Sequence, residues 1–266
     1  MNASTFLVTG GTGSLGSRVV NRLRGAGREV RALSRSGRSG TVRGDLLTGE
    51  GLKEAVEGVD VIVHCASSPT KTRRTDVEGT ERLLKTAEQA GVSNFVFISI
   101  VGVDRNPYYP YYRMKLEVER IIEQSAVPYT ILRATQFHEF VLRLIQFLDR
   151  LPVMVMPKGF LLQPIDIGEV ADRLVEIALS EPAERASDIG GPEIKTAAEF
   201  ARVYFKASGR SRKVMEVPLP GKMARAWCQG AQLALDHKYG RITWEEFLRQ
   251  TLRSSNTDET ARKELA

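Results

Sequence analysis

The sequence predicts an α/β protein built on a doubly wound parallel sheet, with a smaller C-terminal region. Six short runs of apolar and β-branched residues recur in the first half of the 266-residue chain, and helical stretches separate most of them. A glycine-rich turn follows the first run. Parallel strands need a crossover long enough to hold a helix, so this alternation indicates parallel pairing.

The elements follow in order from the apolar pattern. The expected strands occupy residues 5–9, 29–33, 41–43, 59–64, 95–98 and 129–132. Two helices are predicted from apolar residues at helical spacing, one after the first strand and one between the fourth and fifth. Their stripes consist of Leu15, Val19, Val20 and Leu23, and of Leu83, Leu84, Ala87 and Ala90. Residues 59–63 are almost continuously apolar, which is typical of a strand covered on both faces.

Composition excludes several classes of protein. With 42% hydrophobic and 26% charged residues, the chain is neither disordered nor fibrous in character. Two cysteines, Cys65 and Cys228, without a C-x-x-C pair indicate neither a disulfide framework nor a metal site. The first residues lack the pattern of a signal peptide, and no run of about 18 apolar residues occurs. We therefore expect a cytoplasmic protein with no membrane partner.

The net charge of +6 is concentrated in one segment. Residues 1–43 hold eight arginines and one acid, whereas the remaining 223 residues carry a net charge of −1. A protein that coats polyanions along its whole surface is therefore disfavoured.

The glycine-rich turn indicates a dinucleotide site. Gly10, Gly13 and Gly16 form a G-x-x-G-x-x-G pattern between the first strand and the first helix. A tight strand-to-helix turn, close approach of a pyrophosphate and close helix packing each require a residue without a side chain. Thr12, Ser14 and Leu15 complete the turn, whose helix N-terminus presents free N–H groups to phosphate. The predicted sheet is therefore of the Rossmann type.

The end of the second strand favours NADP over NAD. An NAD site usually has an acid about 20 residues after the glycines, and this chain has Ser34 and Arg35 there. A guanidinium would pair bidentately with a 2′-phosphate, and Arg38 would assist. The alternative is that both arginines are solvated loop charges. Asp45 and Leu46, after the third strand, are further candidate cofactor contacts, with the Asp45 carboxylate accepting from the adenine amino group.

Prolines change the rhythm of the chain after residue 150. Seven of them break it into short elements, among which helices are predicted at 169–179, 197–207 and 243–252. We expect a dinucleotide-binding domain at 1–150, a substrate-covering region at 151–253 and a frayed tail at 254–266.

Several motifs together resemble the atypical short-chain dehydrogenase/reductase superfamily, in particular its NmrA-like branch of NAD(P)-binding proteins. The motifs are VTGGTGSLG at 8–16, Ser34-Arg35, RGDL at 43–46, VIVHCAS at 61–67, YYRMK at 111–115, LRATQF at 132–137 and QPIDIGEVA at 163–171. The resemblance implies that Ala66, Ser67, Lys115, Ala134 and Thr135 also line the cofactor site.

The resemblance also implies a proton donor. Its Tyr-x-x-x-Lys motif corresponds to Tyr111 and Lys115, which an i, i+4 spacing places on one helical face. The ammonium is expected to lower the tyrosine pKa, so that the phenol protonates a carbonyl as hydride arrives. The alternative is a structural tyrosine within a segment that is rich in tyrosines.

The catalytic serine of the family is not in its usual register. Ile100 occupies the position of the second residue of a Ser-Ser pair, and only Ser99 has a hydroxyl. Loss of a polarising donor commonly costs about two orders of magnitude in rate. Three interpretations stay open: Ser99 substitutes, the substrate needs no such donor, or the protein binds NADP without catalysis.

A substrate pocket is expected around Gln136, His138 and Ile100. His138 is either an alternative acid or an ordinary residue of an early helical turn. The apolar residues that follow, at 140–148, predict a helix that belongs to the core or to an apolar pocket wall.

The function predicted from these observations is reduction of a small, largely apolar carbonyl, quinone or aromatic acceptor by NADPH. The alternative is a redox-sensing regulator that binds NADP and a protein partner, as the NmrA-like resemblance allows. Nucleic-acid binding through the basic N-terminal segment is a third, disfavoured hypothesis. No metal is expected, and the oligomeric state is open.

Overall fold

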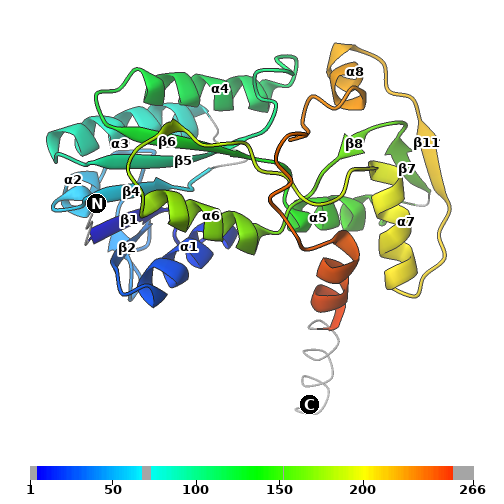
Figure 1. Cartoon of the computed structure of the whole chain (residues 1–266), viewed down its shortest axis with the longest axis horizontal. Coiled ribbons are helices and arrows are strands. Elements are labelled where there is room, and N and C mark those ends of the chain that lie inside the picture. The colour runs from blue at the N-terminus through cyan, green and yellow to red at the C-terminus, as the bar shows by residue number, and fades with distance from the viewer. Residues whose placement is uncertain (1–4, 68–72, 152, 254–266) are drawn as a thin grey trace. The chain divides into compact units, whose positions relative to one another are not determined.

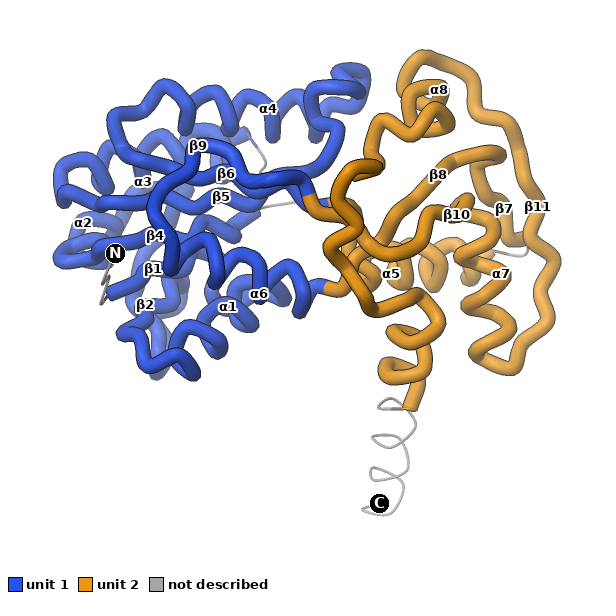
Figure 2. Tube along the Cα trace, in the orientation of Figure 1, with its two compact units in different colours: residues 1–134, 167–188 blue, residues 135–166, 189–266 orange. Residues whose placement is uncertain are grey.

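The computed structural model describes residues 5–67, 73–151 and 153–253, which form the coloured ribbon of Figure 1. The chain divides into two compact units. Unit 1 comprises residues 1–134 and 167–188, and unit 2 comprises residues 135–166 and 189–266 (Figure 2).

Unit 1 contains the predicted doubly wound parallel sheet. Its strands are β1 (Thr5–Thr9), β2 (Glu29–Ser34), β3 (Val42–Arg43), β4 (Val61–His64), β5 (Asn94–Ile100), β6 (Tyr129–Ala134) and β9 (Glu184–Arg185). They lie in the order β3-β2-β1-β4-β5-β6-β9, and every neighbouring pair is parallel. The order reverses between β1 and β4, so the carboxyl ends of these two strands flank the crevice where such sheets bind ligands.

Helices cover both faces of this sheet (Figure 1). One face carries α1 (Ser14–Gly25) and α6 (Ile167–Ala178), and the other carries α2 (Leu52–Val56), α3 (Glu78–Gln89) and α4 (Pro110–Glu123). On the α3/α4 face, alternate strand residues such as Ile62, Phe95 and Phe97 pack in one buried cluster with helix residues such as Leu83 and Val118.

The predicted helical stripes are confirmed with one correction. Leu15, Val19, Val20 and Leu23 of α1 are buried, as are three of the four residues predicted for α3. Ala90 is exposed instead, because α3 ends at Gln89 and Ala90 is its C-cap residue. The helix therefore stops just before the chain turns at Gly91, whose φ is +71°.

A buried ion-pair network joins α4 to the sheet. The Glu119 side chain is 0% exposed, and it accepts hydrogen bonds from Arg133 of β6, from Nε at 2.9 Å and from Nη2 at 2.6 Å. Arg185 of β9 donates to the same carboxylate at 3.3 Å, and Asp104 lies 3.0 Å from Arg133. These ion pairs raise the pKa of the Arg133 guanidinium even though burial opposes them. No local pattern in the sequence indicates this network, because its members lie far apart along the chain.

The units do not follow the predicted linear boundaries. The chain enters unit 2 after Ala134 rather than after residue 150, and residues 167–188 return to unit 1. The physical reason is that the strand β6 ends at Ala134, where the chain leaves the sheet. The later helix α6 still covers a face of that sheet, and β9 pairs with β6. The substrate-covering role expected for 151–253 stays a prediction, and residues 254–266 lie outside the described residues.

Unit 2 has its own apolar core. Its elements are α5 (His138–Leu148), β7 (Met154–Pro157), β8 (Leu161–Leu162), β10 (Lys195–Thr196), α7 (Ala197–Ala207), β11 (Val214–Val217), α8 (Lys222–Cys228) and helical residues 244–253. β7 and β11 are parallel, whereas β8 and β10 are antiparallel. The predicted helix at 197–207 matches α7. Its N-terminus is capped by Thr196, which forms a reciprocal capping box with Glu199. The core gathers buried residues of α5, β7 and α7 around Trp244.

The two units differ in charge. By sequence, residues 1–134 and 167–188 carry 21 Lys and Arg against 20 Asp and Glu, whereas residues 135–166 and 189–253 carry 15 against nine. The arginine-rich segment at 1–43 is thus offset by acids within its own unit. The charge excess of the folded chain lies in unit 2.

No helix within the described ranges is long and apolar enough to cross a membrane. The cytoplasmic location stays a prediction.

Candidate functional site

The glycine-rich turn lies where β1 meets α1, as predicted. Gly10 has a φ of +64°, and a Cβ there would lie 2.9 Å from the Ala66 Cα. A Cβ on Gly16 would lie 2.2 Å from the Gly10 carbonyl oxygen, and the Gly13 N–H donates to that same oxygen at 2.8 Å. The turn is therefore too tight for side chains at its first and third glycines.

The N-terminus of α1 is available to an anion. Thr12, Gly13 and Ser14 are exposed, whereas Leu15 and Gly16 are buried. The N-cap residue Gly13 offers no side-chain cap, and the first turn contains no acid. The first N–H groups of a helix have no partner within it, so they and the helix dipole favour a phosphate here. These residues fit the pyrophosphate of a dinucleotide.

Two arginines at the end of β2 are open to a ligand. Arg35 and Arg38 are exposed, and within the part of the chain that the structure describes their side chains have no polar partner. The other six arginines of residues 1–43 interact within the chain; Arg22, for instance, pairs with Asp172, and Arg43 with Glu50. Ser34 is half-buried, with its Oγ 3.1 Å from that of Ser36.

Asp45 and Leu46 have structural contacts after β3. The Asp45 Oδ1 accepts a hydrogen bond from the Leu47 N–H at 2.9 Å, which closes a local turn. Leu46 is buried and lies so close to α3 that a Cβ on Gly79 would come within 3.0 Å of it. Their predicted contacts with a cofactor stay predictions.

His64 at the end of β4 is a structural residue. The Thr80 hydroxyl donates to the Asp76 carbonyl at 2.5 Å. The Thr80 Oγ1 is then the acceptor for the His64 Nε2–H at 3.1 Å. His64 Nδ1 then accepts from the Thr9 hydroxyl at 2.7 Å, and Thr9 Oγ1 accepts from the Ala66 N–H at 3.2 Å. Burial, with a smaller effect of Lys115, lowers the pKa of His64 to about 3. The imidazole is therefore neutral at physiological pH.

Tyr111 and Lys115 lie on one face of α4, as their spacing predicts. Pro110 occupies the start of the helix, so Tyr111 falls in its first turn. The Lys115 Nζ lies 6.0 Å from the centroid of the Tyr111 ring and 5.0 Å from that of Phe97. Lys115 is 4% exposed, and burial lowers its pKa although Asp76, Cys65 and Glu119 favour its charged form.

The Tyr111 hydroxyl belongs to a chain of polar contacts that the sequence did not reveal. Its Oη lies 3.2 Å from the Ser67 Oγ, and the Ser67 hydroxyl donates to Asp76 Oδ2 at 2.6 Å. Burial raises the pKa of Tyr111, the Ser67 bond opposes this effect and the Asp76 charge adds to it. The expected lowering of the Tyr111 pKa is therefore wrong for this arrangement, because the effects of burial and of the Asp76 charge exceed that of the contact with Ser67.

Strand parity decides between Ser99 and Ile100. β5 continues to Ile100, two residues beyond the predicted end, so side chains alternate through this segment. Phe97 lies beneath Lys115, and Ser99 shares its face of the sheet, whereas Ile100 lies on the opposite face. Ser99 is 2% exposed, and its Oγ has no hydrogen-bond partner among the described residues. The hydroxyl on the face of Tyr111 and Lys115 is thus that of Ser99.

Ala134 and Thr135, predicted to contact the cofactor, are both buried. Ala134 ends β6, where its carbonyl accepts from the Val101 N–H at 3.0 Å. Thr135 begins unit 2, where its hydroxyl donates to the Gln163 carbonyl, and the Gln136 amide oxygen accepts from the Gln163 N–H at 3.3 Å. These two bonds hold the first residues of unit 2 to residue 163.

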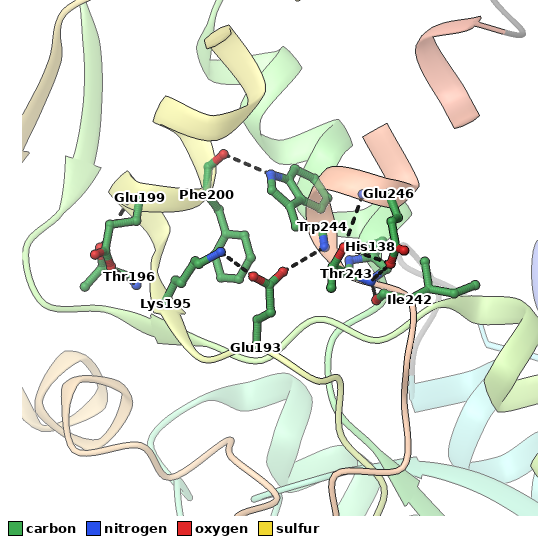
Figure 3. A network of polar contacts seen from close by, with 10 residues as sticks. All are labelled: His138, Glu193, Lys195, Thr196, Glu199, Phe200, Ile242, Thr243, Trp244 and Glu246. Carbon is green, nitrogen blue, oxygen red and sulfur yellow. Dashed lines mark hydrogen bonds and ion pairs between the residues drawn. The ribbon is translucent and has the colours of Figure 1, made fainter. Parts of the chain in front are cut away.

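His138 lies inside the core of unit 2 rather than at an open surface (Figure 3). It is 1% exposed, its ring stacks on Phe247 with centroids 5.0 Å apart, and its Nε2 donates to the Ile242 carbonyl at 3.0 Å. Burial lowers its pKa. Glu193 accepts from the Trp244 N–H at 2.8 Å and so holds the start of the helix at 244–253, to which Phe247 also belongs (Figure 3). His138 is a packing residue, and the alternative-acid interpretation has no support in this geometry.

The apolar helix at 140–148 is only partly core. Val141, Leu142 and Ile145 of α5 are buried, whereas Phe140 and Phe147 are 58% and 64% exposed. Leu144 is also exposed, and these three residues form a stripe at i, i+4 and i+7. Unit 2 therefore presents an apolar helical surface in addition to its core.

The family comparison matches the region that carries the turn, Tyr111 and Lys115. A family model described as NAD(P)H-binding matches residues 10–140. This part of the chain is similar to NAD(P)H-binding domains and comprises 131 of the 266 residues, just under half of the chain. It extends from the glycine turn through β6 and into α5.

Curated relatives of the chain include assembly factors and reductases. The photosystem II assembly factor Ycf39 of Trieres chinensis is 27% identical over 231 residues, which cover 81% of this chain and 72% of the relative. The (4-alkanoyl-5-oxo-2,5-dihydrofuran-3-yl)methyl phosphate reductase of Streptomyces griseus subsp. griseus is 28% identical over 261 residues, with coverages of 93% and 86%.

Solved structures share the fold. The NADPH-dependent quinone oxidoreductase QOR2 of Escherichia coli, complexed with NADPH, has a TM-score of 0.76 at 17% identity. The superposition covers 93% of this chain and 99% of the QOR2 chain. A short-chain dehydrogenase/reductase superfamily protein of Agrobacterium tumefaciens with bound NAD has a TM-score of 0.74 at 21% identity, with coverages of 98% and 100%.

Proposed function

We propose that this protein is an NADPH-dependent oxidoreductase that reduces a small, largely apolar carbonyl, quinone or aromatic acceptor. The observation that carries the proposal is the placement of Tyr111, Lys115 and the unpartnered hydroxyl of Ser99 on one face of the sheet, at the carboxyl ends of β4 and β5.

The chain's own residues hold the cofactor. The N-terminus of α1 would hold the pyrophosphate, and Arg35, assisted by Arg38, would hold the 2′-phosphate. The bound dinucleotide supplies the hydride. Lys115, buried and without a hydrogen bond to any described side chain, is placed to hold the ribose hydroxyls and to attract electron density that develops on Tyr111.

The remaining residues handle the proton. The raised pKa of Tyr111 keeps its phenol protonated at neutral pH, so that it is a donor rather than a base. Ser99 Oγ donates to the acceptor oxygen and orients it toward Tyr111, a contact that would satisfy a hydroxyl that is otherwise buried without a partner.

An apolar acceptor is supported by the character of unit 2. Phe140, Leu144 and Phe147 of α5 offer an apolar helical surface that the core of the unit does not need. The streptomycete relative is named a reductase and the QOR2 structure a quinone oxidoreductase, which supports the same reaction class.

The second candidate function is an NADP-binding regulator or assembly protein without turnover, of the NmrA-like kind. The Ycf39 relatives favour it, because they are named assembly factors rather than enzymes. Incubation of the protein with NADPH and a panel of quinones and ketones separates the two functions. Acceptor-dependent loss of NADPH absorbance is expected of an oxidoreductase, whereas tight NADPH binding with no turnover on any acceptor would establish the regulator.

Replacement of Arg35 tests the cofactor preference. We expect Arg35→Ser to raise the Kd for NADPH about 10- to 100-fold and to leave the Kd for NADH nearly unchanged, because a charge-assisted bidentate pair is lost. Isothermal titration calorimetry with both cofactors measures this. Arg120→Ser, at an exposed position near the end of α4, is the matched control for a lost positive charge. Equal losses for NADPH and NADH in Arg35→Ser would show that Arg35 does not recognise the 2′-phosphate.

A further inference from the structure

Asp76 is a buried acid connected to the Tyr111 hydroxyl through one serine. Asp76 is 3% exposed, and its Oδ2 accepts a hydrogen bond from the Ser67 hydroxyl at 2.6 Å. Because the Ser67 proton points to Asp76, the 3.2 Å contact between Ser67 and Tyr111 requires the phenol to be the donor. The resting arrangement is therefore Tyr111 O–H to Ser67, and Ser67 O–H to the Asp76 carboxylate.

The backbone around Asp76 has an unusual conformation and is held in place. Asp76 lies in η1 (Arg73–Val77), a π-helical turn that leads directly into α3. Such turns are rare and occur frequently at functional sites. The Thr80 hydroxyl donates to the Asp76 carbonyl, and the buried His64 holds Thr80 in turn. These contacts fix the position of the carboxylate relative to β4 and so to Ser67.

Two titratable groups at the end of β4 carry no charge. Burial raises the pKa of the Cys65 thiol to about 12 and lowers that of His64 to about 3, so both groups are neutral at physiological pH. Burial also raises the pKa of Tyr109, whose ring lies 6.2 Å from that of Tyr111. Among the described residues, the charges that these contacts place beside Tyr111 are the Lys115 ammonium on its own helix and the Asp76 carboxylate, which Ser67 links to the phenol, and their effects on the phenol are opposite.

We propose that Asp76 is a positioning residue that acts through Ser67 to aim the Tyr111 phenol and to hold its proton against the pull of Lys115. Without this anion, the pKa of the phenol would fall, although burial would still raise it. Ser67 is the adjustable part, because its hydroxyl can turn from Asp76 to a phenolate once the proton has left. The assignment of Tyr111 as donor rests on the proposed function, but the coupling between Asp76 and Tyr111 does not.

The sign of the effect follows from charge. An anion near a phenol raises its pKa, so Asp76→Asn lowers the pKa of Tyr111, by about one pH unit or more at the separation that two hydrogen bonds impose. Ser67→Ala keeps the anion and removes the donor to a phenolate, so it raises the same pKa. A residue that only supports the fold would not shift the pKa in opposite directions in these two variants.

The experiment measures the pKa of Tyr111 directly. The Cζ resonance of isotopically labelled tyrosine is followed by NMR against pH in the full chain, and Tyr111→Phe identifies the signal among the seven tyrosines. Glu78→Gln is the matched control, because it removes an acid two residues from Asp76 that pairs with Arg82 instead. We expect a lower pKa in Asp76→Asn, a higher one in Ser67→Ala and no shift in Glu78→Gln.

Two outcomes overturn the proposal: an unchanged Tyr111 pKa in Asp76→Asn, or a fall in Ser67→Ala as large as that in Asp76→Asn. If Asp76→Asn does not fold, the exposed Ser67→Ala still decides, because a pKa that does not rise contradicts the coupling. Where an acceptor is known, the basic limb of the rate profile moves with the measured pKa. Opposite pKa shifts without turnover on any acceptor would support the coupling and reject the reductase.

Discussion

Replacement of Tyr111 by phenylalanine is expected to lower NADPH-dependent reduction by about two to four orders of magnitude, the usual contribution of a positioned proton donor. The Tyr111 ring lies 6.0 Å from the Lys115 Nζ and its hydroxyl contacts Ser67, so the substitution removes the donor of the proposed reaction. NADPH affinity should change little, because the proposed function assigns the phosphates to α1 and Arg35 rather than to Tyr111.

The measurement compares the kcat of Tyr111→Phe with the wild type at saturating NADPH. Tyr108→Phe is the matched control, because it removes a hydroxyl from the same segment at a side chain that is 50% exposed. Turnover in Tyr111→Phe within a factor of a few of the wild type would remove the proton-donor role. A loss of NADPH affinity as large as the loss of turnover would point to a binding role instead.

Replacement of Glu119 by alanine is expected to reduce the free energy of unfolding of unit 1 by about 3–5 kcal/mol. The change leaves the Arg133 guanidinium, 10% exposed, inside the protein with only Asp104 as an ion-pair partner. A buried charge that loses its partner is much more costly than the pair was favourable. This loss is a large fraction of the stability of an ordinary domain.

Urea unfolding followed by circular dichroism measures this effect. Tryptophan fluorescence would not, because Trp227 and Trp244 both lie in unit 2. Glu123→Ala is the control. Glu123 lies on the same helix as Glu119 and pairs with Arg185 of β9 at 2.6 Å, but its side chain is 38% exposed. Its loss should cost about 1 kcal/mol or less. Similar costs for the two variants would show that Glu119 is not a buried anchor.

Most of unit 1 was predictable because its signals are local. The stripe of Leu15, Val19, Val20 and Leu23 has the period of a helix, and the strand runs have the apolar character of a sheet covered on both faces. The glycines of the turn report backbone conformation, since Gly10 has a positive φ and Gly16 touches the Gly10 carbonyl. Tyr111 and Lys115 share a face by spacing alone.

Long-range polar contacts were not predictable, because no period links their residues. Ser67, Asp76 and Tyr111 come from the end of β4, from η1 and from α4, and they meet only when the sheet and both helices have formed. Likewise, the choice between Ser99 and Ile100 required the true end of β5, because one residue reverses the face of the sheet. His138 could be assigned to the core only once Trp244 and Phe247 lay against it.

The sequence by itself determined the parallel α/β architecture, the glycine turn between β1 and α1, the two arginines after β2 and the shared helical face of Tyr111 and Lys115. Each of these depends on residues within one turn, one helix or one strand end. The tertiary structure alone decided the return of residues 167–188 to unit 1, the sheet face of Ser99 and the burial of the acids Asp76 and Glu119. The physical reason is that burial, charge pairing and the resulting pKa depend on which distant segments exclude water together.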